Sequence, residues 1–222
     1  MILSNGNLAQ ALKDNNLQDV LDAIDDDRKN GCDFYNCHIG GKPVLVYAML
    51  NGCDNSIMKA LFEDGATFSK KVNNDEIFSE IVFEKNDDLF NYIFENKDKL
   101  IEDKETFESF FVTCVIANNL KYVKKLIPFA DNTYVDRSGY SAVHYACETD
   151  SDNVLKFLLE NNFESQLLLK NKVEETPMNC AKFEKNTNSV QVIGDYLNRK
   201  EDLKKISKVI NKDNVNHSSF KI

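Results

Sequence analysis

Proline and glycine are scarce in this sequence of 222 residues, with three and eight residues respectively. A β fold with many tight turns needs both residues, so their scarcity favours helices joined by short loops. No apolar run reaches the roughly 18 residues that a membrane-spanning helix requires, so no such helix is expected. Hydrophobic residues make up 42% and charged residues 28% of the chain. These values are ordinary for a folded globular protein and exclude disorder as the main state.

A secretion signal is also lacking. The residues Met1–Gly6 contain no basic segment, and no long apolar run follows them. The six cysteines of the chain therefore indicate reduced thiols rather than disulfides. We expect a protein of the cytoplasm or the nucleus.

Negative charge dominates the chain, and it is unevenly placed. The net charge is −9, yet residues 200–222 carry six lysines against three carboxylates, a local charge of +3. Residues 1–199 therefore carry −12. Because an acidic surface repels phosphate backbones, nucleic acid is not expected as a partner. The charge instead favours another protein with a basic or mixed surface.

One segment shows a two-helix unit most clearly. Ser141 stands where an N-cap hydroxyl can accept a backbone N–H of the first turn. Val143, Ala146 and Cys147 then form a narrow apolar face on a short helix. Residues 153–162 contain a second apolar face at helical spacing. The pattern predicts two short antiparallel helices.

The same unit recurs along the chain. Thr176 followed by Pro177 begins another copy, since proline fits the first helical position, where its missing N–H would have no partner. Six copies align on one small or apolar position of the first helix. These positions are Ala11, Ala48, Ile81, Cys114, Ala146 and Ala181, at spacings of 37, 33, 33, 32 and 35 residues. The spacing indicates a repeat of roughly 33 residues.

The chain resembles the ankyrin repeat family, whose pattern is Asp-x-x-Gly-x-Thr-Pro-Leu-His-x-Ala-Ala. The matching residues of the fifth unit are Asp136, Gly139, Ser141, Val143, His144, Ala146 and Cys147. Those of the sixth unit are Thr176, Pro177, Met178 and Ala181. Residues 75–127 depart most from the pattern. They lack the Thr-Pro-Leu-His signature and contain Phe78, Phe83, Phe90, Phe94, Phe107, Phe110 and Phe111.

The resemblance implies an all-α fold, an ankyrin-repeat solenoid of about six helix-turn-helix repeats within residues 1–199, with divergent middle repeats. Leu203, Ile206 and Ile210 follow at i, i+3 and i+7 between lysines. This spacing predicts an amphipathic helix in residues 200–222 that caps the last repeat, with a frayed tail from residue 213.

Two groups of residues invite a chemical interpretation. Asp136, Ser141 and His144 have the residue types of a catalytic triad. All three occupy motif positions, however, and the resemblance implies an internal structural hydrogen bond between Ser141 and His144. The second group, a candidate zinc site, is Cys32, Cys37, His38 and Cys53. It contains one loose cysteine pair and no second pair, so we do not predict zinc.

The remaining cysteines and aromatic residues are interpreted as core. Cys114, Cys147 and Cys180 follow the repeat period, and a free cysteine packs as a small hydrophobe. The phenylalanines of the middle repeats recur at helical spacing, which favours a core over a ligand pocket. No phosphate-binding loop, paired-carboxylate motif or HExxH helix occurs. We therefore expect no cofactor and no enzymatic activity.

Proteins of this architecture bind partners along the first helices and the loops that precede them. The residues before each aligned position are expected near this surface: Gln10, Tyr47, Glu80, Thr113, Tyr145 and Cys180. The loop before the fifth unit adds Tyr134, Arg137 and Tyr140. Tyr47 and Tyr145 are the best anchors, because tyrosine offers a large contact area at low entropic cost. Replacing both by alanine is expected to weaken partner binding without unfolding.

Three functions follow, in decreasing order of support. The first is an interaction scaffold or adaptor that binds another protein through the acidic concave face and the hairpin tips, with an affinity that falls as salt rises. The second is an inhibitory regulator, or a pathogen or viral effector, that occludes a host enzyme or transcription factor. The third, an enzyme on a helical scaffold, has no supporting motif. The sequence predicts neither the partner nor the oligomeric state.

Overall fold

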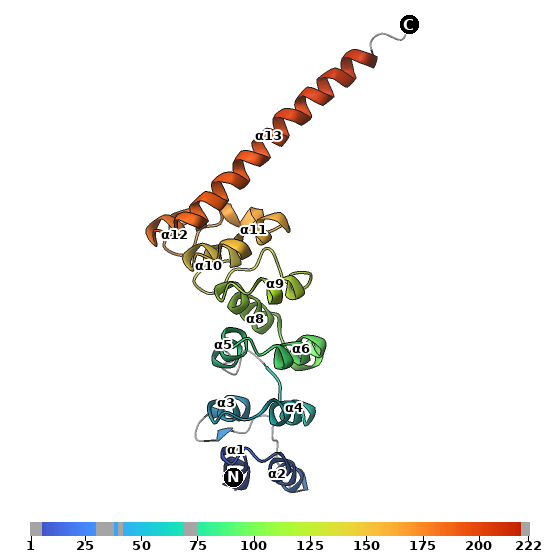
Figure 1. The fold of residues 1–222 in the computed structure, drawn as a ribbon, viewed down its shortest axis with the longest axis vertical. Coiled ribbons are helices and arrows are strands. Elements are labelled where there is room, and N and C mark those ends of the chain that lie inside the picture. Colours follow the sequence, from blue (N-terminus) through green and yellow to red (C-terminus); the bar gives the residue numbers. More distant parts are fainter. Residues whose placement is uncertain (1–5, 30–37, 40–41, 69–74, 219–222) are drawn as a thin grey trace. The chain divides into compact units, whose positions relative to one another are not determined.

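The structure is a computed structural model that describes residues 6–29, 38–39, 42–68 and 75–218. The chain divides into two compact units. Unit 1 comprises Met1–Thr113 and Leu126–Ala130, and unit 2 comprises Cys114–Lys125 and Asp131–Ile222. Short helices follow one another in pairs along the chain (Figure 1).

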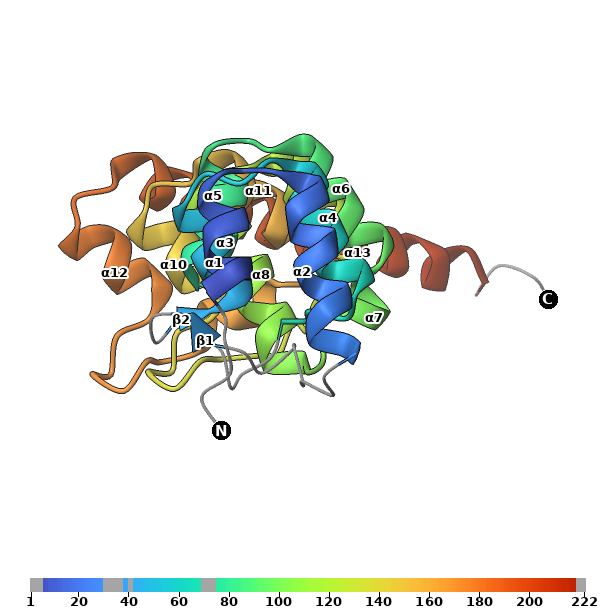
Figure 2. The ribbon, with the colours of Figure 1, turned by 90° about the horizontal axis from the view of Figure 1, so that it is seen from below.

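Unit 1 begins with three pairs of helices. They are α1 (Gly6–Lys13) with α2 (Leu17–Lys29), α3 (Val44–Leu50) with α4 (Asn55–Glu63), and α5 (Asp75–Phe83) with α6 (Asp87–Glu95). The first helices α1, α3 and α5 form one row and the second helices α2, α4 and α6 form another (Figure 2). A short helix α7 (Lys97–Leu100) follows. The small strands β1 (His38–Ile39) and β2 (Lys42–Pro43) pair antiparallel ahead of α3.

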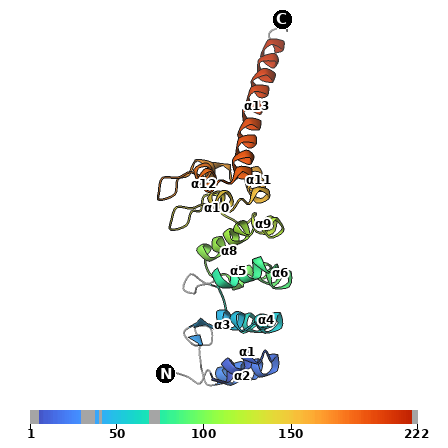
Figure 3. The ribbon, with the colours of Figure 1, turned by 60° about the vertical axis from the view of Figure 1, so that its left-hand side comes forward.

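Unit 2 contains the later helices. They are α9 (Leu120–Leu126, whose last residue is assigned to unit 1), α10 (Ala142–Glu148), α11 (Asp152–Glu160), the 3-10 helix η2 (Glu164–Leu168), α12 (Pro177–Phe183) and α13 (Thr187–Ser218). Helix α8 (Lys104–Ile116) passes from unit 1 into unit 2 at Cys114. The loops that precede α10 and α12 lie on the same side of these helices (Figure 3).

Each first helix ends in the same left-handed turn, four residues after the aligned position. The residues with positive φ are Asn15, Gly52, Lys85, Asn118, Asp150 and Lys185. The next N–H in every case donates to the carbonyl of the aligned residue, for example Asn16 to Ala11 at 3.2 Å and Asn186 to Ala181 at 2.8 Å. This is the Schellman arrangement, which satisfies carbonyls that a helix end leaves without partners. The six aligned positions are all buried, as the predicted alignment requires.

At Cys53 and at Asn186, the residue after the left-handed turn also links neighbouring pairs of helices. The Cys53 thiol donates to the carbonyl of Leu12 at 3.1 Å. The Asn186 amide donates to the carbonyls of Cys147 at 2.8 Å and Glu148 at 2.7 Å. One side chain thus binds the C-terminal end of the preceding first helix. The same kind of contact occurs within unit 1 and within unit 2.

A series of phenylalanine rings fills the core of unit 1. The Phe78 ring centroid lies 5.0 Å from that of Phe68 and 4.6 Å from that of Phe110, and the Phe110 centroid lies 5.4 Å from that of Phe90. All four side chains are fully buried. The interpretation of these aromatic residues as core is therefore confirmed. Of the other phenylalanines predicted as core, Phe94 and Phe107 are only half-buried, and 52% of the surface of Phe83 is exposed at the C-terminal end of α5.

The cysteines at the repeat period are buried as predicted. Cys114 and Cys147 are fully buried and Cys180 is 4% exposed, and all three are free thiols. Burial raises the pKa of each thiol, so these groups stay protonated near neutral pH. They fill space in the core.

The C-terminal segment differs from the prediction. Residues 200–218 form no separate capping helix but continue α13, which is unbroken from Thr187 to Ser218. Its early residues Ile193 and Tyr196 are buried, whereas Leu197 and Leu203 are 51% and 64% exposed. Leu203 therefore does not cover the last pair of helices. Among the residues that the structure describes, no helix combines the length and apolar character of a membrane-spanning segment.

Candidate partner-binding surface

The loops before α10 and α12 contain the same kind of turn, which one side chain in each loop stabilises. The Asp136 carboxylate accepts the N–H groups of Ser138 at 2.8 Å and Tyr140 at 2.9 Å. The Asn171 side-chain oxygen accepts those of Val173 at 3.0 Å and Glu175 at 2.9 Å, 35 residues later. These side chains hold each loop in a fixed form ahead of its helix.

Gly139 allows the two loops to lie against each other. Its φ is +79°, and a Cβ atom at this position would lie 3.0 Å from the Cα of Asn171. The Lys172 N–H donates to the carbonyl of Ser138 at 2.9 Å across this contact. Glycine is required here for both its conformation and its lack of a side chain.

His144 is a structural residue. Its Nδ1 accepts the N–H of Ser141 at 3.2 Å and lies 2.9 Å from the Ser141 hydroxyl. The Nε2 atom must then carry the proton, and it lies 3.1 Å from the carbonyl of Glu175, to which it donates. The Ser141 hydroxyl in turn accepts the N–H of His144 at 3.3 Å, which completes a capping box. The predicted internal hydrogen bond is confirmed.

The pKa of His144 is lowered, first because of burial. The unfolded chain therefore binds a proton at this ring at higher pH than the folded chain does. As pH falls below about 6.5, the unfolded value, the free energy of unfolding is expected to decrease. Above that pH the imidazole is neutral in both states and its titration has no effect.

This pH dependence can be isolated with His144→Asn, since asparagine occupies the equivalent position 179 in the next unit. We expect the stability advantage of the wild type over the variant to shrink by at most about 1.4 kcal/mol per pH unit below pH 6.5. Urea denaturation at pH 7.5, 6.5 and 5.5 measures this difference. A difference that stays constant, or that grows on acidification, would contradict the lowered pKa.

Tyr140 and Tyr145 form an aromatic pair beside this network. Their ring centroids are 5.2 Å apart, and the Tyr145 hydroxyl donates to the Asp136 carboxylate at 2.6 Å. Burial raises the pKa of both phenols. Both side chains are half-buried, so the rings are held in place while part of each remains accessible.

Carboxylates surround this pair. The pKa of Glu148 is raised by partial burial and by the negative charges of Glu184 and Glu175. The charge of Glu148 also raises the pKa of Tyr140. Glu148 and Glu184 come from the ends of α10 and α12, and Glu175 comes from the loop before α12. The acidic aromatic face of unit 2 is defined here as Tyr140, Tyr145, Glu148, Glu175 and Glu184.

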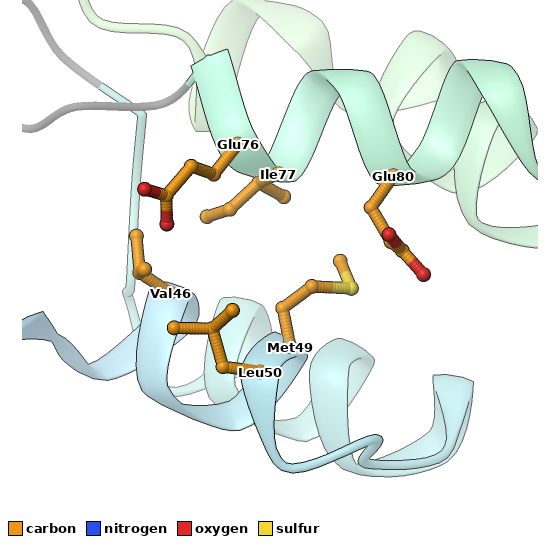
Figure 4. A pocket seen from close by; sticks show the side chains of 6 residues that line it. All are labelled: Val46, Met49, Leu50, Glu76, Ile77 and Glu80. Atoms are coloured by element: carbon orange, nitrogen blue, oxygen red, sulfur yellow. The ribbon is translucent and has the colours of Figure 1, made fainter.

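Unit 1 has a groove between α3 and α5 (Figure 4). It contains a pocket of about 220 Å³ lined by Val46, Met49, Leu50, Glu76, Ile77 and Glu80. A second pocket of about 140 Å³ shares Met49 and Glu80 with the first and also includes Glu84. Of the predicted site residues, only Glu80 lies in this groove. The others were not predicted, although Glu76, Glu80 and Glu84 recur in the sequence every four residues.

The predicted surface residues differ in accessibility. Tyr47, Tyr134 and Tyr145 are half-buried, and Gln10, Glu80 and Arg137 are exposed. The predicted accessibility is wrong for two residues. Thr113 is 8% exposed, and its hydroxyl donates to the carbonyl of Ser109 at 2.9 Å within α8. Cys180 is 4% exposed. The repeat spacing does not reveal their burial.

The structure describes only some of the candidate zinc residues. Cys32 and Cys37 lie outside the described residues, and so does the side chain of His38. Burial, followed by the charge of Asp54, raises the pKa of Cys53 to about 11. This thiol is the donor to the Leu12 carbonyl described above, which gives it a structural role.

Comparisons with known proteins agree with this architecture. Residues 78–171 match the sequence model of the ankyrin repeat family, in three copies. The match includes the divergent middle units that lack the Thr-Pro-Leu-His signature. No curated protein sequence is significantly similar to the chain.

Solved structures extend the likeness beyond the matched residues. The crystal structure of EF0377, an ankyrin repeat protein, aligns with a TM-score of 0.64 and 18% identity over 85% of this chain and 96% of that chain. The ankyrin repeat domain of Bcl-3, a member of the IκB protein family, gives a TM-score of 0.52 and 15% identity over 84% and 97%. The chain therefore contains ankyrin repeats and has the fold of ankyrin repeat proteins. Ankyrin repeats generally mediate protein–protein interaction. The number of repeats outside residues 78–171 stays a prediction.

Proposed function

We propose that this chain binds another protein through the acidic aromatic face of unit 2. The observation that carries the proposal is the gathering of carboxylates beside two tyrosines whose ring centroids are 5.2 Å apart, where burial and the charges of Glu184 and Glu175 raise the pKa of Glu148. Like charges held together are unfavourable in the free protein, and a cationic partner relieves this repulsion. The loop residues Tyr134 and Arg137 belong to the same proposed surface. Tyr47 stays a proposed contact in unit 1.

The chemistry of this face selects a partner segment with arginine or lysine side chains. A guanidinium or ammonium group can approach the carboxylates while its stem packs on the rings of Tyr140 and Tyr145. The rings are already ordered by contacts with His144 and Asp136, so little side-chain entropy is lost on binding. We propose a role as an interaction scaffold or adaptor in the cytoplasm or nucleus. The described cysteines are free thiols, which supports a reducing compartment.

The proposal is tested with Glu148→Lys. The wild-type protein is first used to capture a partner from a lysate of the cells that produce this protein. The affinity between the two is then measured by isothermal titration calorimetry. Glu148→Lys is expected to weaken binding about tenfold or more, because it places a like charge against a cationic segment. The wild-type affinity is also expected to fall as salt rises.

Asp195→Lys is the matched control, because it changes the net charge equally on an exposed position of α13. It should leave the affinity within about twofold of the wild-type value. Equal affinities of the Glu148→Lys variant and the wild type would reject this face as the binding site. An assay of the captured partner's own activity, with and without this protein, separates an adaptor from an inhibitor.

A further inference from the structure

Helix α5 presents a row of carboxylates along one side of the groove in unit 1. Glu76, Glu80 and Glu84 follow at i, i+4 and i+8, and all three are exposed. Residues four apart on a helix are neighbours, so the three negative charges lie along one side of α5. Among the described residues, no lysine or arginine forms an ion pair with these three carboxylates. The row therefore attracts cationic side chains.

The opposite side of the groove is apolar. Val46, Met49 and Leu50 line it from α3 (Figure 4). The second pocket continues the groove past Met49 and includes Glu84. Each of the two pockets is smaller than the roughly 300–1,000 Å³ of small-molecule sites. The groove therefore fits individual side chains of a protein segment better than a small molecule.

Two large apolar side chains add to this surface. Leu50 and Phe83 each stand two residues after an aligned position, in the first helices α3 and α5, which contact each other. Their surfaces are 57% and 52% exposed, respectively. Because Phe83 follows Glu80 by three residues, both lie on the same side of α5. The carboxylates are thus accompanied by exposed apolar surface that a partner can cover.

A helix matches this surface better than an extended segment does. Glu76 and Glu84 are about 12 Å apart along the axis of α5, at about 1.5 Å per residue. A helix that lies along α5 meets this row with a basic residue at every fourth position, and its adjacent stripe can carry apolar side chains toward α3. An extended segment with basic residues at alternate positions turns its other side chains away from the groove.

We propose that the α3–α5 groove binds an amphipathic helix of another protein, with lysine or arginine at every fourth position beside an apolar stripe. The basic residues pair with the three glutamates of α5, and the apolar stripe packs on Met49, Leu50 and Phe83. Charge complementarity selects this occupant, because an acidic helix would be repelled by the glutamates. The groove belongs to unit 1 and shares no residue with the acidic aromatic face of unit 2, so either proposal can fail without the other.

The experiment uses a fluorescein-labelled peptide of about 18 residues, built from leucine, alanine and lysine in this pattern. Fluorescence anisotropy measures its affinity for the full chain at low and high salt. We expect the wild type to bind it about tenfold more tightly than a scrambled peptide of the same composition, and more weakly as salt rises. A version with a central proline, which interrupts the helix, is expected to bind about tenfold more weakly.

Charge reversal tests the row of glutamates. The groove variant is Glu76→Lys with Glu80→Lys. It is expected to bind the basic peptide about tenfold more weakly than the wild type, and to prefer a peptide in which glutamate replaces lysine. The matched control is Glu63→Lys with Glu95→Lys, which makes the same charge change at exposed residues of α4 and α6. It should stay within about twofold of the wild type. Far-ultraviolet circular dichroism checks that both variants are folded.

The apolar contact is tested with Leu50→Ala combined with Phe83→Ala. This variant keeps every charge of the groove, so its loss of affinity is expected to persist at high salt, at about tenfold. A loss that disappeared at high salt would contradict the packing of the apolar stripe.

Four outcomes would overturn the proposal. The first two are a wild type that binds the patterned and scrambled peptides equally, or that binds neither. The third is a groove variant that binds the basic peptide as strongly as its control, and the fourth is a proline peptide that binds as well as the patterned one. Glu148→Lys should leave peptide binding within about twofold. If Glu148→Lys alone abolished binding, the peptide would occupy unit 2, and the assignment to the groove would be wrong.

Discussion

Replacing Phe110 with alanine is expected to lower the free energy of unfolding by about 3–5 kcal/mol. Phe110 is fully buried, and its ring contacts Phe78 and Phe90 from two other helices of unit 1. Removing the ring loses its apolar burial and leaves a cavity that rigid neighbours fill only in part. Urea denaturation followed by far-ultraviolet circular dichroism measures the change.

Phe83→Ala is the matched control for this prediction. The same side chain is removed from the same unit, but Phe83 is 52% exposed. Its loss is expected to change the free energy of unfolding by about 0.5 kcal/mol or less. Similar losses for the two variants would mean that the ring contacts of Phe110 do not define the core of unit 1.

Replacing His144 with alanine is expected to cost about 2–4 kcal/mol. The imidazole is fully buried, and it joins the N–H of Ser141 to the carbonyl of Glu175. Without the imidazole, both backbone groups lose a hydrogen-bond partner. The start of α10 is then no longer linked to the loop before α12 through this side chain. Buried polar groups without partners are among the costliest single changes.

The control for His144→Ala is Asn179→Ala. Asn179 stands at the equivalent position, 35 residues later, but it is exposed and bonds within its own turn to Thr176. Its loss is expected to cost less than about 1 kcal/mol. If Asn179→Ala destabilised the protein as much as His144→Ala, the position in the repeat would matter more than the link between neighbouring units.

Much of the fold could be predicted from the sequence, because the repeat requires the same type of residue at each buried position. Ala48, Ile81 and Ala146 are fully buried at equivalent positions of three first helices, and the recurrence of this buried position is visible as a spacing. The left-handed turns were harder to predict, since Lys85 and Asp150 adopt them as Gly52 does. There the backbone hydrogen bonds of the helix end offset the unfavourable conformation.

The candidate site was less predictable. The position before each small residue was expected to be accessible, and this holds for Glu80 and in part for Tyr145. It fails for Thr113 and Cys180, which neighbouring atoms cover. The charges that raise the pKa of Glu148, besides its burial, come from Glu184 and Glu175, on another helix and on the loop before it, so no single segment of sequence contains this cluster.

The sequence by itself determined the two-helix units, their spacing and most of the buried apolar residues, because these follow from local periodicity and from side-chain size. Only the tertiary structure decided which polar residues are buried, which carboxylates lie together and how far α13 extends. Those features arise from contacts between residues about 30 to 40 positions apart, such as His144 with Glu175 and Asn186 with Cys147. The stacking of one unit on the next creates them, and a local pattern cannot specify them.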